Sequence, residues 1–459
     1  MSEALTLRIP PADEAQRARP RTSTPARLRS LSLAIMVGAG VLALAGTVAL
    51  ALTQTTIDSI GHRTVPAIID AQKIHESLAD ADRSAANDFL SGGVELGAPR
   101  KQYLSDINAA TSQLQQASEH NAVGSKASRK LQDVSAKVTE YTGLVETARA
   151  YNRVGYPVGA TYLRTASRLM HDPQAGILVD VDALDRLNYQ DLGRENTLIL
   201  IAAGTLVAFY IVGLGLLVVL AYTQGFLRTR FRRRRNLGVL AAMVLLLLLG
   251  GGLGVQASYT YVNIREAQLQ TFNRLHLLWQ ARSLAVDANG NESLSLIARG
   301  TGASFDEAFK AQTKQLVDRP LTDAMIDAAA RGDVRFKGLL ADEIKGATFA
   351  GERDAAVLTL RAYQQFLQID QAVRDKAPSD RDGAVALALG SGPGQLGAAF
   401  AALDASLGKV IGIIRERYNA AIAAASPNLA LDAGVPLCAL AIVLLVYWGL
   451  KPRLAEYTA

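Results

Sequence analysis

The sequence predicts an all-α membrane protein with four transmembrane helices and two extracytoplasmic helical-bundle domains in tandem. Three observations predict this fold class. The chain of 459 residues is 49% hydrophobic but only 6% aromatic, which is unusual for a soluble enzyme of this size. Long segments with mixed charges carry apolar residues at helical spacing, and strand patterns are nearly absent. Finally, four stretches of about the length that a membrane helix needs contain no Asp, Glu, Lys or Arg: 30–57, 196–227, 236–264 and 433–450.

The first and last of these stretches leave an alternative open. Ala49-Leu50-Ala51 fits the cleavage rule of a signal peptide, but the apolar run is much longer than a signal core, which favours an uncleaved anchor. The fourth span is the weakest because it contains Pro436 and has Asp432 at its end. A carboxylate is tolerated at the membrane interface, so we keep this span.

Orientation follows from the positions of Lys and Arg, which concentrate on the cytoplasmic side of membrane proteins. Six arginines lie in the N-terminal tail, six lie in the loop 228–235, and Lys451 and Arg453 lie at the C-terminus. With four spans these segments share one side, so we expect a multi-pass plasma-membrane protein with both termini in the cytoplasm. The expected order is a basic cytoplasmic tail (1–30), span 1 (31–52), outer bundle 1 (53–195), span 2 (196–222), a cytoplasmic Arg-rich loop (223–236), span 3 (237–257), outer bundle 2 (258–429), span 4 (430–450) and a cytoplasmic tail (451–459).

The two halves of the chain have the same layout of span, outer segment and span. The stretches "SLADADRSAANDFLSGG" (77–93) and "SLAVDANGNESLSLIARG" (283–300) occupy comparable places after their spans. This faint similarity supports a duplication.

Both outer segments are predicted to be helical, with about four long helices in each. Glycine and proline clusters separate the helices, and Pro66 predicts a kink near the start of the first. Three apolar stripes have a spacing of three and four residues. They are Ile57, Ile60, Thr64, Ala67, Ala71, Ile74, Leu78, Ala81 and Ala85; Leu131, Val134, Val138, Tyr141, Val145 and Ala148; and Leu396, Phe400, Leu403, Leu407, Val410 and Ile414.

The sequence contains no recognisable catalytic motif. There is no Walker loop, G-x-S-x-G, H-E-x-x-H or cysteine pair, and the single cysteine, Cys438, lies in the fourth span. We therefore expect no enzyme activity and no cofactor or metal. The histidines are expected to be solvated on helix surfaces; they are His62, His75, His120, His171 and His276. Because the cytoplasmic segments are too short to bury a core, any output needs a separate protein.

The arginine run has two possible roles. It can orient the chain and attract anionic lipid, at about 1 kcal/mol per Arg near the surface, or it can dock an acidic cytoplasmic partner. No nucleic acid is expected, because only Phe231 is available for stacking. The candidate residues are Arg228, Arg230, Arg232, Arg233, Arg234 and Arg235.

An outer stretch, "YTGLVETARAYNRVGYPVGATYLRTASRLM" (141–170), combines tyrosines and arginines around a Gly-Tyr-Pro break. Such a combination suits recognition of an anion or of a partner, although a tightly packed turn with exposed charges would look the same. The candidate residues are Arg149, Tyr151, Arg153, Tyr156, Tyr162 and Arg164. In the second half, the polar residues of "WQARSLAVDANGNESLSLI" (279–297) are expected to form the wet face of a bundle helix.

These stretches, with "SAANDFLSGG" (84–93) and "DANGNESLSLIARG" (287–300), resemble the actinobacterial GlnX-type four-span membrane proteins and, more distantly, chemoreceptor-like four-helix-bundle sensors. The resemblance implies a transmembrane signal relay for amino-acid availability. In it, an extracytoplasmic solute-binding lipoprotein of GlnH type senses aspartate or glutamate, and a cytoplasmic serine/threonine protein kinase of PknG type receives the signal. No contact residues follow from the resemblance.

Other functions remain open from the residues alone. The bundles could bind a small ligand directly, as chemoreceptors do, or the chain could be a structural or accessory protein of the cell envelope. A transporter subunit is disfavoured because the spans, apart from Asp432, lack ionisable residues. A homodimer is plausible because Gly250, Gly251, Gly252 and Gly254 permit close helix approach, although they could equally pack the two halves of one chain.

Overall fold

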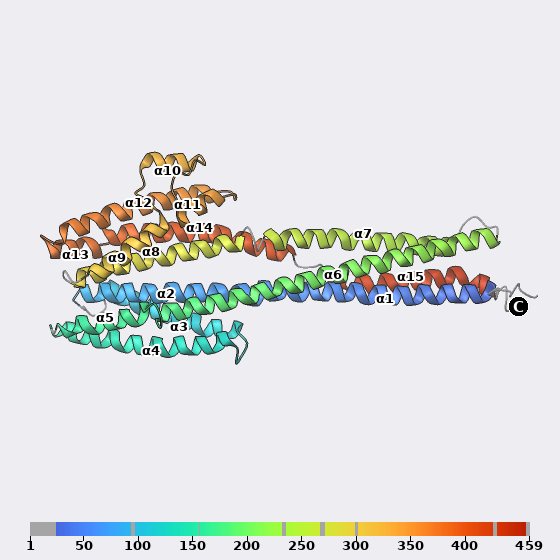
Figure 1. Ribbon diagram of the computed structural model, residues 1–459, viewed down its shortest axis with the longest axis horizontal. Helices are drawn as coiled ribbons and strands as arrows, with labels where there is room; N and C mark the ends of the chain where they lie inside the picture. The colour runs from blue at the N-terminus through green and yellow to red at the C-terminus, as the bar shows by residue number, and fades with distance from the viewer. Residues whose placement is uncertain are drawn as a thin grey trace, which may run out of the picture. The chain divides into compact units, whose positions relative to one another are not determined.

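A computed structural model describes residues 24–92, 97–155, 157–231, 236–266, 271–298, 302–425 and 429–455 (Figure 1). Within these residues all regular structure is helical and no strand is present, which confirms the predicted all-α class. The chain divides into two compact units. Unit 1 comprises Met1–Thr53, Leu200–Ala257 and Pro427–Ala459, and unit 2 comprises Gln54–Ile199 and Ser258–Ser426.

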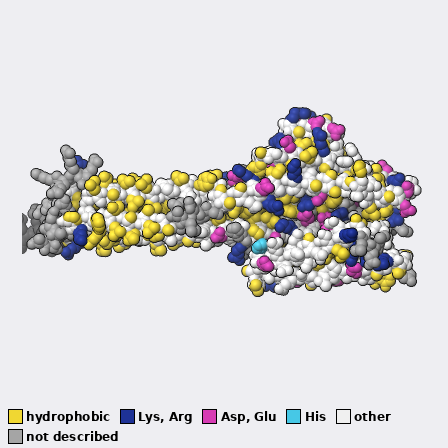
Figure 2. Space-filling view, turned by 180° about the vertical axis from the view of Figure 1, so that it is seen from behind, with side chains coloured by type: hydrophobic (Ala, Val, Ile, Leu, Met, Phe, Trp, Pro, Cys, Tyr) yellow, Lys and Arg dark blue, Asp and Glu magenta, His cyan; other side chains and the backbone are white. Residues whose placement is uncertain are grey.

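Unit 1 is built from parts of four helices: α1 (Thr24–Ser59), α6 (Ile177–Phe231), α7 (Leu237–Arg265) and α15 (Leu429–Ala455). All four contribute to one apolar cluster, with Leu42, Phe209, Ala242 and Ile442 among its buried members. The outward-facing side chains are also apolar, as the hydrophobic surface of these helices in Figure 2 shows. Helices that are apolar on every face are typical of membrane spans.

Five helices in the described part of the chain are long and apolar enough to cross a membrane, judged by length and composition. Four overlap the predicted spans, at Ala26–Ser59, Leu200–Thr229, Leu237–Arg265 and Ala433–Pro452. The fifth is α14 (Leu396–Ala425), which belongs to unit 2 and packs its apolar side chains into the core there. A multi-pass membrane protein is thus supported, whereas the count of four spans is not confirmed.

The first half of unit 2 contains α2 (Val65–Leu90), α3 (Ala98–His120), α4 (Lys126–Arg153), α5 (Val158–His171) and the start of α6. Helix α5 and the start of α6 follow one another along α4, since Gly159 packs against the carbonyl of Ala148 and Lys130 reaches Asp180 at 3.0 Å. The arrangement is a four-helix bundle whose fourth helix is interrupted between α5 and α6.

The second half of unit 2 also contains four long helices: α8 (Asn273–Ala298), α9 (Ala303–Leu316), α12 (Glu352–Lys376) and α14. Three short helices connect or flank them: α10 (Asp323–Ala330), α11 (Leu339–Gly346) and α13 (Arg381–Leu389). The predicted number of about four long helices per outer segment agrees with both halves.

The two halves share one core. Helix α2 of the first half packs lengthwise on α8 of the second half, and one apolar cluster includes residues of both. The two outer segments therefore form a single compact unit, and their expected separation into two tandem domains is not confirmed.

The predicted helix faces agree with the structure. Every member of the three apolar stripes is buried. The expected glycine breaks after α2 and α4 also occur, because Gly92 and Gly155 adopt positive φ angles of 82° and 77° that favour glycine.

The expected irregularity at Pro66 takes the form of a π-helical turn. This turn, η1 (Ile60–Thr64), lies between α1 and α2, directly before Val65 and Pro66. Proline has no backbone N–H to donate, so the hydrogen-bond pattern must change near it. At the comparable place in the second half, Glu266, Thr271 and Phe272 are also π-helical.

Candidate functional site

The predicted outer cluster lies where α4 ends and α5 begins. The rings of Tyr151 and Tyr162 stack with centroids 5.5 Å apart and an angle of 7° between their planes. Arg149 turns inward, and its Nε lies 3.3 Å from Oδ2 of the buried Asp88 on α2. The structure thus brings the two tyrosines together and directs Arg149 to a carboxylate of the chain.

The remaining predicted residues of this cluster are Arg153, Tyr156 and Arg164. The Arg164 guanidinium donates to the carbonyl of Ala160 on its own helix, at 3.3 Å. Arg153 is exposed at the end of α4, and Tyr156 lies outside the described residues. Contact of these residues with a ligand or partner stays a prediction.

A second ion pair lies beside Arg149 and Asp88. Arg100 reaches Glu146 at 2.7 Å, and its guanidinium lies 5.1 Å from the centre of the Tyr103 ring. Burial raises the pKa of Asp88, although Arg149 and Arg100 counteract part of this effect. Among the described residues, Oδ1 of Asp88 has no hydrogen-bond partner, so this corner retains one unused acceptor.

The buried Asp82 on α2 contacts polar side chains from other helices of the first half. Asp82 accepts hydrogen bonds from Tyr141 at 3.0 Å and Ser167 at 2.9 Å, and His171 Nε2 lies 3.2 Å away. Burial alone would lower the pKa of His171, but Asp82 raises it to about 8. Asp82 therefore joins α2, α4 and α5 through charge-assisted contacts.

Arg282 on α8 connects the two halves of unit 2. It lies 2.6 Å from Glu76 of α2 and donates two hydrogen bonds to Asp404 of α14, at 2.6 and 2.9 Å. Burial raises the pKa of Glu76 to about 7, although the Arg282 charge opposes the increase. Nearby, His75 Nδ1 lies 2.7 Å from the Ser283 hydroxyl, a further polar contact between α2 and α8.

Replacing Arg282 by Met should loosen the α2–α8 contact. The change leaves Glu76 and Asp404 without their shared cation, and we expect the free energy of unfolding to fall by about 2–4 kcal/mol. Hydrogen exchange of α2 and α8 amides in the full-length protein should become faster. Lys409→Met is the matched control, because Lys409 is exposed on α14; similar exchange in both variants would contradict the bridging role.

A denser cluster surrounds Arg374 on α12. Its guanidinium contacts Glu292 of α8, Asp306 of α9 at 2.7 Å and Asp370 of its own helix at 2.8 Å. The ring of Phe309 lies 4.2 Å from the guanidinium carbon. Burial is the largest cause that raises the pKa of Glu292 to about 8, and the negative charge of Asp370 is the second.

Arg274 organises a similar cluster between α8, α11 and α12. It contacts Glu343 at 2.8 Å and also Glu352, whose other oxygen accepts hydrogen bonds from the backbone N–H groups of Thr348 and Phe349. Burial raises the pKa of Glu343 to about 7, with Arg274 lowering it and Glu352 raising it. Unit 2 thus contains several buried carboxylates whose pKa values burial raises.

The structure differs from two sequence expectations about these polar residues. The four histidines whose side chains are described are only partly exposed, and each also faces a carboxylate; for example, His120 lies 2.6 Å from the buried Asp70. The expected wet face of α8 is also buried, since Asn289 and Glu292 are 5% and 2% exposed. The sequence contains a signal for the burial of the α8 residues, because alanines and serines surround them and permit close packing on several sides.

No group of three or more His, Cys, Asp or Glu side chains suited to a metal ion occurs among the described residues.

In unit 1, contacts join helix ends that border the predicted basic segments. Arg27, near the start of α1, lies 5.8 Å from the ring of Phe226 near the end of α6. Asn236, just before α7, donates to the carbonyl of Gly449 near the end of α15, at 2.7 Å. The N-terminal, loop and C-terminal basic segments thus begin close together, as the predicted topology requires.

The arginine run itself is only partly described. Arg228 is exposed in the last turns of α6, and the backbone of Arg230 continues this helix. Arg232, Arg233, Arg234 and Arg235 lie outside the described residues.

Comparison with known proteins gives one match. Residues 56–197 match the family model of an actinobacterial sensor domain. No curated protein and no solved structure matches the chain. The matched segment coincides with the first half of unit 2, so the buried Asp82 and the stacked tyrosines lie within the residues that match the sensor-domain model.

Proposed function

We propose that this membrane sensor protein is a transmembrane signal relay without catalytic activity of its own. In this proposal, an extracytoplasmic solute-binding lipoprotein of GlnH type reports aspartate or glutamate to unit 2. A cytoplasmic serine/threonine kinase of PknG type then receives the signal. The observation that carries the proposal is the sensor-domain match over 56–197 in a chain with several candidate membrane spans.

Two features support a relay. Helix α6 contains the last matched residues, a candidate span and the first arginines of the run within one unbroken element. The cytoplasmic loop expected at 223–236 is too short to fold into an output domain, so in this proposal a separate protein receives the signal there. Small shifts or rotations of helices are an established way to pass such signals.

The docking role of the arginine run can be tested by substitution. Replacing Arg228, Arg230, Arg232, Arg233, Arg234 and Arg235 by Gln should abolish co-purification of the kinase after crosslinking in native membranes. Replacing the same six by Lys preserves the charge and tests whether paired guanidinium contacts are needed. Both variants require a check of topology, because positive charge also sets orientation. If the Gln variant keeps its orientation and its kinase, the docking role is wrong.

Direct sensing of a small ligand is the second candidate. The stacked Tyr151 and Tyr162, with the unused acceptor of Asp88 nearby, favour it. Calorimetric titration of the full-length protein with aspartate or glutamate, without lipoprotein, distinguishes the two functions. Heat that disappears in Tyr162→Ala would support direct sensing, and absence of heat would support the relay. An envelope protein would show neither ligand nor lipoprotein binding.

A homodimer fits the same relay. Gly251 and Gly252 on α7 have no neighbour within 4 Å of the position of an added Cβ, whereas Gly250 and Gly254 pack against Tyr210 of α6. Gly250 and Gly254 thus serve a contact inside the chain, whereas Gly251 and Gly252 leave a face of α7 open. A helix of a second copy can approach this face closely.

A further inference from the structure

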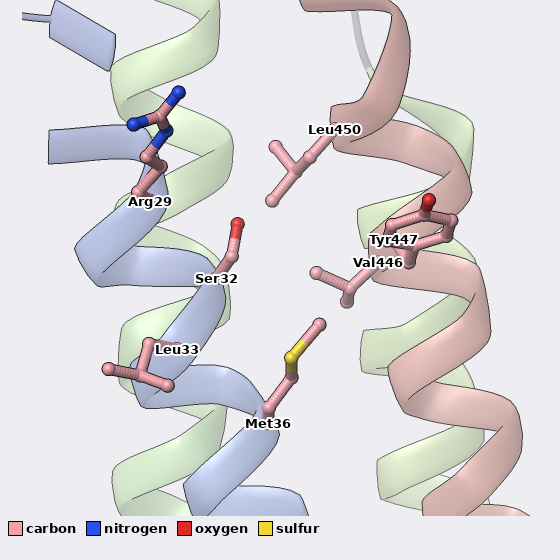
Figure 3. Close-up of a pocket in the computed structure, with 7 residues that line it drawn as sticks. All are labelled: Arg29, Ser32, Leu33, Met36, Val446, Tyr447 and Leu450. Atoms are coloured by element: carbon pink, nitrogen blue, oxygen red, sulfur yellow. The ribbon is translucent and has the colours of Figure 1, made fainter. Parts of the chain in front are cut away.

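A groove runs between α1 and α15 within unit 1 (Figure 3). It has a volume of about 240 Å³. Its lining residues are Arg29, Ser32, Leu33 and Met36 from α1 and Val446, Tyr447 and Leu450 from α15. Both helices are candidate membrane spans, and Leu33 and Met36 are exposed, so the open side of the groove meets the hydrocarbon of a bilayer.

The groove is apolar along its length and cationic at one end. Figure 3 shows Leu33 and Met36 on one side of Ser32 and the Arg29 guanidinium on the other. The Lys451 ammonium lies 5.7 Å from the centre of the Tyr447 ring, which places a second cation beside the groove. An occupant that matches this pattern has a hydrocarbon chain and an anionic head.

We propose that this groove binds one anionic phospholipid. The phosphate contacts Arg29 and Lys451, and one acyl chain lies along Met36, Val446 and Leu450. Arginine suits this role because its guanidinium makes paired hydrogen bonds to phosphate oxygens. Basic residues at the level of the lipid headgroups recognise anionic lipid in this way. The proposal rests on the membrane location of unit 1 and does not depend on the relay.

Arg27 provides a matched comparison. It lies on α1 two residues from Arg29 and carries the same charge at nearly the same depth. Its guanidinium faces the ring of Phe226 on α6, however, and Arg27 is not part of the groove. A specific site must depend on Arg29 and Lys451 and be insensitive to Arg27, whereas general attraction of the basic end would depend on all three.

The test is native mass spectrometry of the full-length protein titrated with phosphatidylglycerol or with phosphatidylcholine of the same acyl chains. The wild-type protein should bind one phosphatidylglycerol molecule more tightly than any further lipid. Each of Arg29→Gln and Lys451→Gln should weaken this binding about fivefold, and the double variant about 30-fold. Arg29→Lys keeps the charge but loses the paired hydrogen bonds, so it should weaken binding less than Arg29→Gln does, and Arg27→Gln should stay within about twofold of wild type.

A second variant tests the acyl-chain part of the groove. Ser32→Phe fills the apolar channel without changing charge, so it should remove the tightest phosphatidylglycerol site. Glycerol phosphate, which has the anionic head but no acyl chain, should not displace the lipid. Displacement by glycerol phosphate would indicate a phosphate site instead of a lipid site. Equal binding of the two lipids, or equal losses in Arg27→Gln and Arg29→Gln, would overturn the proposal.

Discussion

Replacing Arg374 by Met is expected to lower the free energy of unfolding by about 3–5 kcal/mol. Arg374 is the shared cation for Glu292, Asp370 and Asp306, and the first two carboxylates are almost completely buried. Methionine preserves most of the side-chain volume, so the loss reports the charge and its hydrogen bonds. Thermal unfolding of the full-length protein in detergent measures the change.

A control on the same helix separates this effect from a general loss of charge. Arg361 pairs with Asp327 at 3.1 Å, and both side chains are more than half exposed. Arg361→Met should therefore change stability by at most about 1 kcal/mol. The damage in Arg374→Met should also shrink as the pH falls from 9, because Glu292 and Asp370, whose pKa values burial raises, then take up protons. Equal effects of the two substitutions would show that the buried cluster does not stabilise unit 2.

Unit 2 is expected to lose stability as the pH rises from 6 to 9. Burial raises the pKa of Glu292 to about 8 and those of Glu76 and Glu343 to about 7, and Asp82 raises the pKa of His171 to about 8. The folded state therefore binds more protons than the unfolded state in this range, so the stabilisation is present at low pH and is lost as the pH passes the folded-state values.

Groups with lowered pKa values do not reverse this trend. Asp180 has a lowered pKa because Lys137 and Lys130 outweigh the opposing effect of burial, and the backbone N–H groups of Ala175 and Gln174 lower that of Asp172. Their stabilising effect is lost only when the pH falls below their ordinary values near 4. Between pH 6 and 9 their contribution is constant, and the raised groups determine the slope.

Glu292 should make the largest single contribution to this loss. Its titration alone should lower the free energy of unfolding by about 3 kcal/mol between pH 6 and 9. The Glu292→Gln variant removes the titration but keeps a group able to donate a hydrogen bond. It should be more stable than wild type at pH 9 and show a flatter dependence of the unfolding temperature on pH. Glu307→Gln, at an exposed position of α9, should leave the profile unchanged. Wild-type stability that is constant or rises from pH 6 to 9 would contradict this account.

The helices and their buried faces were predictable from the sequence because they depend on periodicity. The stripe from Leu131 to Ala148 repeats every three or four residues, and a helix places all its members on one face that the bundle covers. The same argument holds for the stripe from Leu396 to Ile414. Packing of α2 on α8 was not predictable in this way, since a stripe indicates a buried face without naming the helix that covers it.

The buried charges were harder still to predict. Asp82 is a polar residue on a helix with an amphipathic sequence, and its burial depends on Tyr141, Ser167 and His171, which come from helices far along the chain. Likewise, Arg282 and Asp404 meet only because three helices from both halves pack together. By contrast, the contacts of Arg27 with Phe226 and of Asn236 with Gly449 join span ends that were predicted to lie on one side, because a basic segment borders each of them in the sequence.

The pairing of α2 with α8 also has a consequence for biosynthesis. His75 and Ser283 are in contact although 208 positions separate them in the chain. During translation, α2 leaves the ribosome long before α8 exists, so one side of the first bundle has no covering helix for most of the synthesis time. Contacts between distant residues also slow folding, because a long loop must close before they form. The first half of unit 2 is thus synthesised first, but its core is covered only after α8 has been made. Until then, the exposed side of α2 must be kept from aggregating.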